Sequence, residues 1–129
     1  MKILLADDNP EVRSALRLLL EQEPVLAKVT EVEDTQGLLA YLNQNCPMVV
    51  LLDWELPGLH NSDFLFTVRT YCPETKVIAL SSKFEARQAA LTARVDAFVS
   101  KAEPPEKILS TLWSLIPHLK SQQLPPSTA

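Results

Sequence analysis

The chain has 129 residues, of which 47% are hydrophobic and 22% are charged. This balance is typical of one folded domain and excludes a disordered chain. A net charge of −4 and a pI near 5.1 argue against a nucleic-acid-binding surface on this domain. No apolar stretch is long enough for a membrane span, and the start MKILLADD turns acidic too soon for a signal peptide. We therefore expect a cytoplasmic protein without membrane contact.

The first predicted strand, Lys2–Ala6, is a short apolar run that ends at two adjacent acids, Asp7 and Asp8. The pattern that follows repeats apolar residues three and four positions apart, which indicates a helix with one buried face. Asn9 is a suitable N-cap and Pro10 suits the first helical position, so the start of this helix is well marked. The two acids are either a cap and a solvated surface residue, or both parts of a cation site.

Four further apolar runs alternate with helical patterns. The expected strands are Lys28–Val32, Met48–Asp53, Lys76–Leu80 and Ala97–Ser100, and the expected helices are Thr35–Asn45, Ser62–Tyr71, Glu85–Arg94 and Pro105–Leu119, the last kinked or ended by Pro117. This alternation predicts an α/β domain whose doubly wound parallel sheet carries helices on both faces. We expect residues 1–120 to form this domain, and the polar residues 121–129 to be a tail or the start of an interdomain linker.

The two cysteines, Cys46 and Cys72, each precede a proline at a predicted turn from helix to strand. No metal-ligand spacing surrounds them. We expect reduced thiols, with a disulfide as the alternative, because disulfides are rare in the cytoplasm.

Polar side chains follow the carboxyl ends of the predicted strands, where ligands bind in sheets of this kind. Asp7 and Asp8 follow the first strand, Asp53 ends the third, Ser81 follows the fourth and Lys101 follows the fifth. The crowded carboxylates call for a hard divalent cation, and oxygen ligands with room for water suit Mg²⁺. A cation, a lysine and a hydroxyl can bind three phosphoryl oxygens, and a carboxylate among them can be the nucleophile. Asp53 is placed for that role.

Four motifs in order now resemble the receiver domain of two-component response regulators. They are ADD after the first strand, LLDWELPG at the third, a serine after the fourth, and FVSKAEPPEKI at the fifth. The resemblance covers the chain from Lys2 to about Leu119. It implies a flavodoxin-like fold with strand order 2-1-3-4-5 and a domain that catalyses its own phosphorylation and dephosphorylation without being an enzyme for another substrate.

The resemblance also implies the roles of the site residues. Asp53 would accept a phosphoryl group from the phosphohistidine of a sensor kinase or phosphotransfer protein. Asp8, Asp53 and the backbone carbonyl of Glu55 would hold Mg²⁺, with Asp7 acting through water. Ser81 and Lys101 would bind the phosphoryl group.

A second group of residues would control switching and its duration. Ser81 and Phe98 match the switch positions, although an aromatic residue on a short strand can equally be a core residue. Glu55 and Lys83 match positions that tune dephosphorylation, and their opposite charges suggest a salt bridge across the mouth of the site. The face formed by the fourth helix, fifth strand and fifth helix would be the readout surface and a possible self-dimer interface.

Four residues at three places in the chain depart from the family pattern. Asn61 replaces a usual glycine, Arg94-Val95 replaces a frequent Gly-Ala, and Ala102 replaces a common proline, so we expect no cis peptide there. The motif KAEPPEKI is most similar to receivers joined to helix-turn-helix output domains, so DNA would be contacted only indirectly through such a domain. The alternatives are a stand-alone receiver that acts through protein contacts and a metal-dependent phosphohydrolase.

Overall fold

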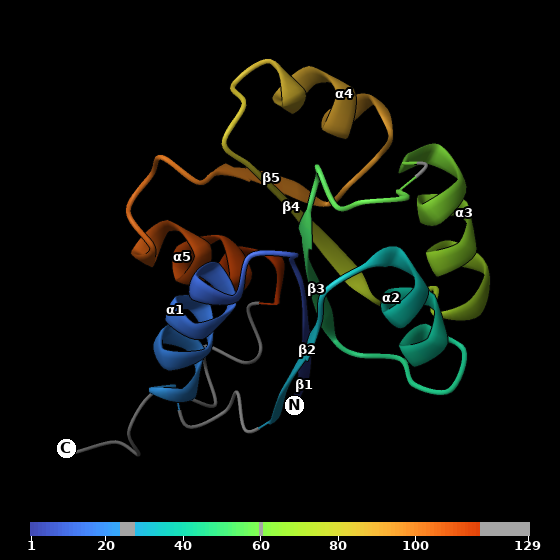
Figure 1. The fold of residues 1–129 in the computed structure, drawn as a ribbon, viewed down its shortest axis with the longest axis horizontal. Helices are drawn as coiled ribbons and strands as arrows, with labels where there is room; N and C mark the ends of the chain where they lie inside the picture. Colours follow the sequence, from blue (N-terminus) through green and yellow to red (C-terminus); the bar gives the residue numbers. More distant parts are fainter. Residues whose placement is uncertain (24–27, 60, 117–129) are drawn as a thin grey trace, which may run out of the picture.

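The computed structural model describes residues 1–23, 28–59 and 61–116, and its centre is one parallel sheet. The strands occur in the spatial order β2-β1-β3-β4-β5 (Figure 1). Their bounds are β1 Lys2–Ala6, β2 Lys28–Val32, β3 Val49–Asp53, β4 Lys76–Ser81 and β5 Ala97–Ser100. The predicted flavodoxin-like fold and strand order are therefore confirmed.

Five helices cover the sheet on both faces. Their bounds are α1 Pro10–Glu21, α2 Thr35–Leu42, α3 Asn61–Tyr71, α4 Ala86–Thr92 and α5 Glu106–Leu115. Figure 1 shows α1 and α5 on one side of the sheet and α2 and α3 on the other, with α4 beyond β4 and β5. This layering explains why all five residues of β3, the middle strand, are buried.

Alternate residues of each strand supply two separate apolar cores. Leu4 of β1 packs with buried residues of α2, α3 and α4, whereas Ile3 and Leu5 pack with buried residues of α1 and α5. Because side chains alternate across a strand, one run of apolar residues in β1 serves both faces. The two cores hold the strands in register, so the carboxyl ends of β1, β3, β4 and β5 lie together.

Helix ends follow local chemistry. The side chain of Asn9 accepts hydrogen bonds from the backbone N–H groups of Glu11 and Val12, which confirms the predicted cap of α1. α2 ends at Leu42, three residues earlier than predicted. No glycine directly follows this helix, so the sequence carried no clear signal for its end. α5 ends at Leu115, since a residue that precedes proline, here Ile116, is disfavoured in the helical region. The predicted kink at Pro117, the end at Leu119 and the tail lie outside the described residues.

The amino-terminal ends of the strands form an edge that we call the base. Here Cys46 and Cys72 are joined by a disulfide with their Cα atoms 5.4 Å apart, so the expectation of reduced thiols is wrong for this structure. The cysteines lie 26 positions apart in sequence, and the turns before β3 and β4 bring them together. Arg94, in the turn before β5, has a φ of 71°, the left-handed conformation that the family's glycine would adopt easily. No cis peptide bond occurs among the described residues.

Candidate functional site

The carboxyl ends of the strands form the opposite edge, which we call the rim, and three carboxylates meet there. Asp7 and Asp8 follow β1, and Asp53 is the last residue of β3. One oxygen from each carboxylate lies within 4.8 Å of the others. Asp7 and Asp53 are buried, whereas Asp8 is exposed and open to solvent. A group of this kind can hold a hard divalent cation with water completing its coordination, so the donor set fits Mg²⁺.

Lys101 provides a positively charged side chain at the rim. Its Nζ lies 2.9 Å from Oδ2 of Asp7 and 3.5 Å from Oδ1 of Asp53. The backbone N–H of Lys101 donates to the carbonyl of Ser81 at 2.8 Å, which ties the residue to the end of β4. Burial alone would lower the pKa of Lys101, but the hydrogen bond to Asp7 and the charge of Asp53 outweigh it and raise the pKa. The ammonium therefore stays charged next to the two carboxylates.

Asp53 is only 3% exposed, and both negative and positive side chains lie near its carboxylate. Burial raises the pKa of Asp53, and the charge of Asp7 adds to this effect. The backbone N–H of Glu55, which donates to Oδ1 of Asp53 at 3.0 Å, and the charge of Lys101 act in the opposite direction. The raised pKa indicates a carboxylate that would gain from a further positive charge.

The side chain of Ser81 is fully buried at the end of β4 and contacts the Glu55 side chain. The Ser81 hydroxyl lies 2.9 and 2.8 Å from the two carboxylate oxygens of Glu55, and the backbone N–H of Lys83 donates to its Oγ at 2.9 Å. The predicted salt bridge between Glu55 and Lys83 does not occur among the described residues. The prediction was wrong because the Glu55 carboxylate is turned to the nearer hydroxyl.

The sequence matches the response regulator receiver domain family over residues 3–112. The chain belongs to this family. It is 32% identical over 101 residues to the Fimbriae Z protein of Salmonella typhimurium. The aligned stretch covers 77% of this chain and 48% of that protein. It is 30% identical over 115 residues to the transcriptional activator protein ExaE of Pseudomonas putida, which covers 87% and 53%. The chain thus spans about half the length of these curated relatives.

A solved receiver domain has the same fold. The BeF3-activated receiver domain of DrrB, from Thermotoga maritima, superposes with a TM-score of 0.77 at 25% identity, covering 90% of this chain and 97% of that one. Among the described residues, none of the helices is both long and apolar enough to cross a membrane.

Phe98 lies on β5 of this receiver domain. Its ring is partly buried and packs against the core shared with α2, α3 and α4. The guanidinium of Arg87, on α4, lies 5.9 Å from the ring centroid, a cation–π distance. The ring therefore packs with the core, and its role as a switch stays a prediction.

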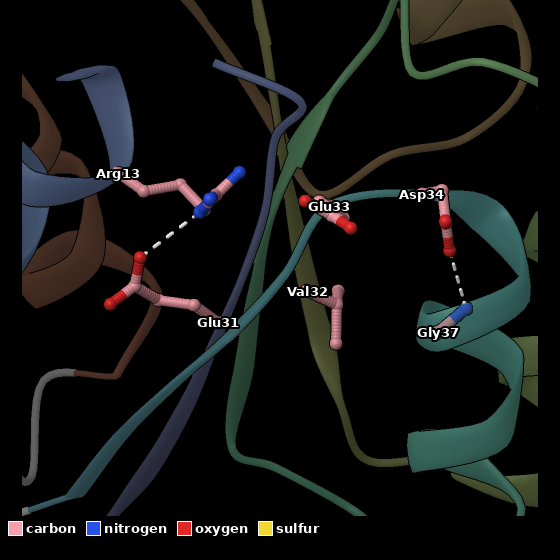
Figure 2. Close-up of a pocket in the computed structure, with 6 residues that line it drawn as sticks. All are labelled: Arg13, Glu31, Val32, Glu33, Asp34 and Gly37. Atoms are coloured by element: carbon pink, nitrogen blue, oxygen red, sulfur yellow. Dashed lines mark hydrogen bonds and ion pairs between the residues drawn. The ribbon is translucent and has the colours of Figure 1, made fainter. Parts of the chain in front are cut away.

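A polar cavity of about 340 Å³ flanks the rim at the ends of β2 and α1 (Figure 2). Arg13 donates to Glu31 at 3.0 Å, and its guanidinium also donates to the backbone carbonyl of Asp7. A hydrogen bond from Arg17 lowers the pKa of Glu31, and the bond from Arg13 adds to this. Arg13 thereby supports the loop that carries the acids.

Sequence reasoning missed two of these contacts. It placed Glu55 at the mouth of the site but did not pair it with Ser81, and it did not single out Arg13. Position was a usable signal for Arg13, because a residue in the first turn of a helix lies beside the preceding loop. For the Glu55 contact there was no signal, since several partners lie within reach of a long side chain.

Proposed function

We propose that this receiver domain accepts a phosphoryl group on Asp53 from the phosphohistidine of a sensor histidine kinase or phosphotransfer protein. The observation that carries the proposal is the buried Asp53 carboxylate with the Lys101 ammonium 3.5 Å away and two further carboxylates beside it. Membership of the response regulator receiver family supports the same role.

In the proposed reaction an Asp53 oxygen attacks phosphorus while the bond from phosphorus to the imidazole nitrogen breaks. The imidazole leaves with the electron pair of that bond, and the product on Asp53 is an acyl phosphate. Lys101 would neutralise part of the charge on the transferred group, because its ammonium is already within contact distance of Asp53. The hydroxyl of Ser81 would donate to a phosphoryl oxygen.

We further propose that Asp8, Asp53 and the backbone carbonyl of Glu55 hold Mg²⁺, with Asp7 acting through water. The crowded carboxylates support this assignment, since among the described residues only the Lys101 ammonium forms ion pairs with them. Bound Mg²⁺ would supply charge neutralisation at the phosphoryl oxygens. Asp7 is less available as a direct ligand, because it already accepts from Lys101 at 2.9 Å and from the backbone N–H of Asn9 at 2.8 Å.

The readout would pass through Ser81 and Phe98 to the face formed by α4, β5 and α5. We propose that this face contacts the output, or a second copy of the domain, once Asp53 is phosphorylated. We also propose that the output is transcription, which rests on the similarity to ExaE and on the shared half of that protein's length. DNA would then be contacted through an output domain and not by residues 1–120. The cytoplasm is the proposed location, because a histidine kinase draws its phosphoryl group from ATP.

Phosphorylation by a small acyl phosphate in the presence of Mg²⁺, followed by intact-protein mass spectrometry, tests the function. We expect one phosphoryl group on the wild type, none on Asp53→Asn, and the wild-type level on Asp63→Asn, an exposed aspartate of α3. Uptake by Asp53→Asn at the wild-type level would contradict the phosphoacceptor assignment. Steady phosphate release from varied phosphomonoesters would instead indicate a phosphohydrolase.

A further inference from the structure

The hydroxyl of Ser81 has one proton, and in this structure it donates that proton in a hydrogen bond to the Glu55 carboxylate. Both Glu55 carboxylate oxygens lie within 2.9 Å of Oγ, and an ionised carboxylate can only accept. The backbone N–H of Lys83 donates to the same Oγ at 2.9 Å, which occupies one of its acceptor positions. The hydroxyl is therefore fixed from both sides, with its proton directed to Glu55.

Glu55 reaches Ser81 from the neighbouring strand end, because β3 and β4 are paired in the sheet. Its backbone N–H donates to Asp53, so its main chain is tied to the end of β3 while its side chain extends to the end of β4. Glu55 is an exposed residue, whereas Ser81 is completely buried. The Glu55 side chain therefore loses conformational entropy when it binds the buried Ser81 hydroxyl. The hydrogen bond from Ser81 must offset this entropy loss.

We propose that Glu55 is a latch that holds the Ser81 hydroxyl until a phosphoryl group displaces it. This inference rests on the proposed function and adds to it a regulatory step at the same site. One proton cannot be donated to a carboxylate and to a phosphoryl oxygen at once, so Ser81 must release Glu55 before it binds the phosphoryl group. The latch makes Glu55 a positioning residue that acts through Ser81 and opposes phosphorylation.

This role differs from the salt bridge with Lys83 that the sequence suggested. A salt bridge would slow the approach of water to phosphorylated Asp53, whereas the latch acts on the unphosphorylated domain. If the latch exists, substitution of Glu55 should change the affinity for a phosphoryl analogue. Substitution of the Lys83 side chain should leave that affinity unchanged.

A double-mutant cycle with beryllofluoride and Mg²⁺ tests the latch by titration calorimetry. We expect Glu55→Ala to bind beryllofluoride about tenfold more tightly than the wild type, the size of one hydrogen bond to a charged group. In a Ser81→Ala background the same change should alter affinity by less than about twofold, because the latched group is gone. Glu85→Ala, which removes an exposed glutamate near α4, is the charge-matched control and should leave affinity unchanged.

A readout without any phosphoryl analogue separates the latch from a simple charge effect. In ligand-free Glu55→Ala, the amide resonance of Lys83 should move in the direction that beryllofluoride moves it in the wild type, since both release the hydroxyl from Glu55. An equal gain in affinity with and without the Ser81→Ala substitution, or an unchanged Lys83 amide, would overturn the latch.

The two proposals fail in different ways. If wild type and Glu55→Ala bind beryllofluoride no better than Asp53→Asn and take up no phosphoryl group, the proposed function is lost and the latch with it. If the wild type binds the analogue in an Asp53-dependent way while Glu55→Ala matches Glu85→Ala, only the latch is lost.

Discussion

The rim and the base are the two ends of the same five strands. Polar groups at the base are paired with hydrogen-bond partners, whereas carboxylates crowd together at the rim. At the base, Asp96 accepts from the backbone N–H of Val77 at 2.7 Å and from Arg69 at 2.9 Å, and the buried hydroxyl of Thr75 donates to the carbonyl of Pro47 at 2.6 Å. At the rim, three carboxylates lie within 4.8 Å of one another and share the ammonium of Lys101.

The difference shows how a parallel sheet divides stability and function between its ends. Groups at the base are paired with opposite charges or hydrogen-bond partners, so their loss leaves a buried partner unsatisfied. The carboxylates at the rim repel one another until a cation binds, so the loss of one of them can relieve that repulsion. Removal of a paired side chain at the base should therefore weaken the fold, whereas removal of the Asp53 charge at the rim should strengthen it.

The disulfide at the base gives the largest expected effect. Its closure of a segment with a sequence separation of 26 corresponds to about 3.5 kcal/mol of stability in the chain-entropy model. We expect a thiol reductant to lower the free energy of unfolding of the wild type by that amount, measured by urea denaturation. Cys46→Ser should start at the lower value and show no further response to the reductant.

Phosphoryl uptake should be nearly independent of this disulfide, because the disulfide lies at the base and Asp53 lies at the rim. Thiols would be the favoured state in the cytoplasm proposed above, so the reduced form should be as active as the oxidised one. A large change of uptake on reduction would show that the two ends are coupled, and would break the comparison.

Asp96→Ala is expected to cost about 2 kcal/mol of unfolding free energy, because it leaves the buried N–H of Val77 and the guanidinium of Arg69 without this acceptor. Asp96→Asn keeps an oxygen for Val77 and should cost less. Thermal and urea unfolding measure both variants. Equal losses in the two variants would mean that the charge, and not the hydrogen bond to the strand, is what matters at the base.

The sequence predicted much of this division, because strand ends can be read from local apolar patterns. Asp7, Asp8, Asp53, Ser81 and Lys101 each end or follow an apolar run, and parallel pairing then brings them to one edge. Contacts that depend on side-chain conformation or on the third dimension could not be predicted. The latch contact of Glu55 is one of several within reach of that side chain, and the disulfide depends on two turns that adjacent strands bring together.

Asp53→Asn should raise the free energy of unfolding of the metal-free domain at neutral pH. The folded-state pKa of Asp53 is raised, so the folded state holds the proton more tightly than the unfolded state. Wild-type stability therefore falls as pH rises from the ordinary carboxyl pKa through the raised one. The side-chain amide of the Asp53→Asn variant does not titrate, so it causes no such fall. The gain should vanish in acid, below the ordinary pKa.

Denaturation of both proteins in a chelator, across this pH range, measures that gain. Added Mg²⁺ should stabilise the wild type more than Asp53→Asn, because a cation that binds only the folded state adds stability by mass action. A variant less stable than the wild type at neutral pH without metal would contradict the idea that the rim acids repel one another.

Arg94→Gly should give the smallest effect, and it separates backbone strain from side-chain contacts at the base. Arg94 has a φ of 71°, a conformation that costs an ordinary residue about 1 kcal/mol and glycine almost nothing. Its carbonyl accepts from Arg69 at 3.2 Å, and a substitution keeps that backbone group. Glycine also has a more flexible unfolded state, which returns part of the gain, so the expected net increase is about 0.5 kcal/mol. Arg94→Ala keeps the Cβ atom and should show no increase. If alanine and glycine stabilise the domain equally, as measured by urea unfolding, removal of the arginine side chain is the cause and the turn carries no strain.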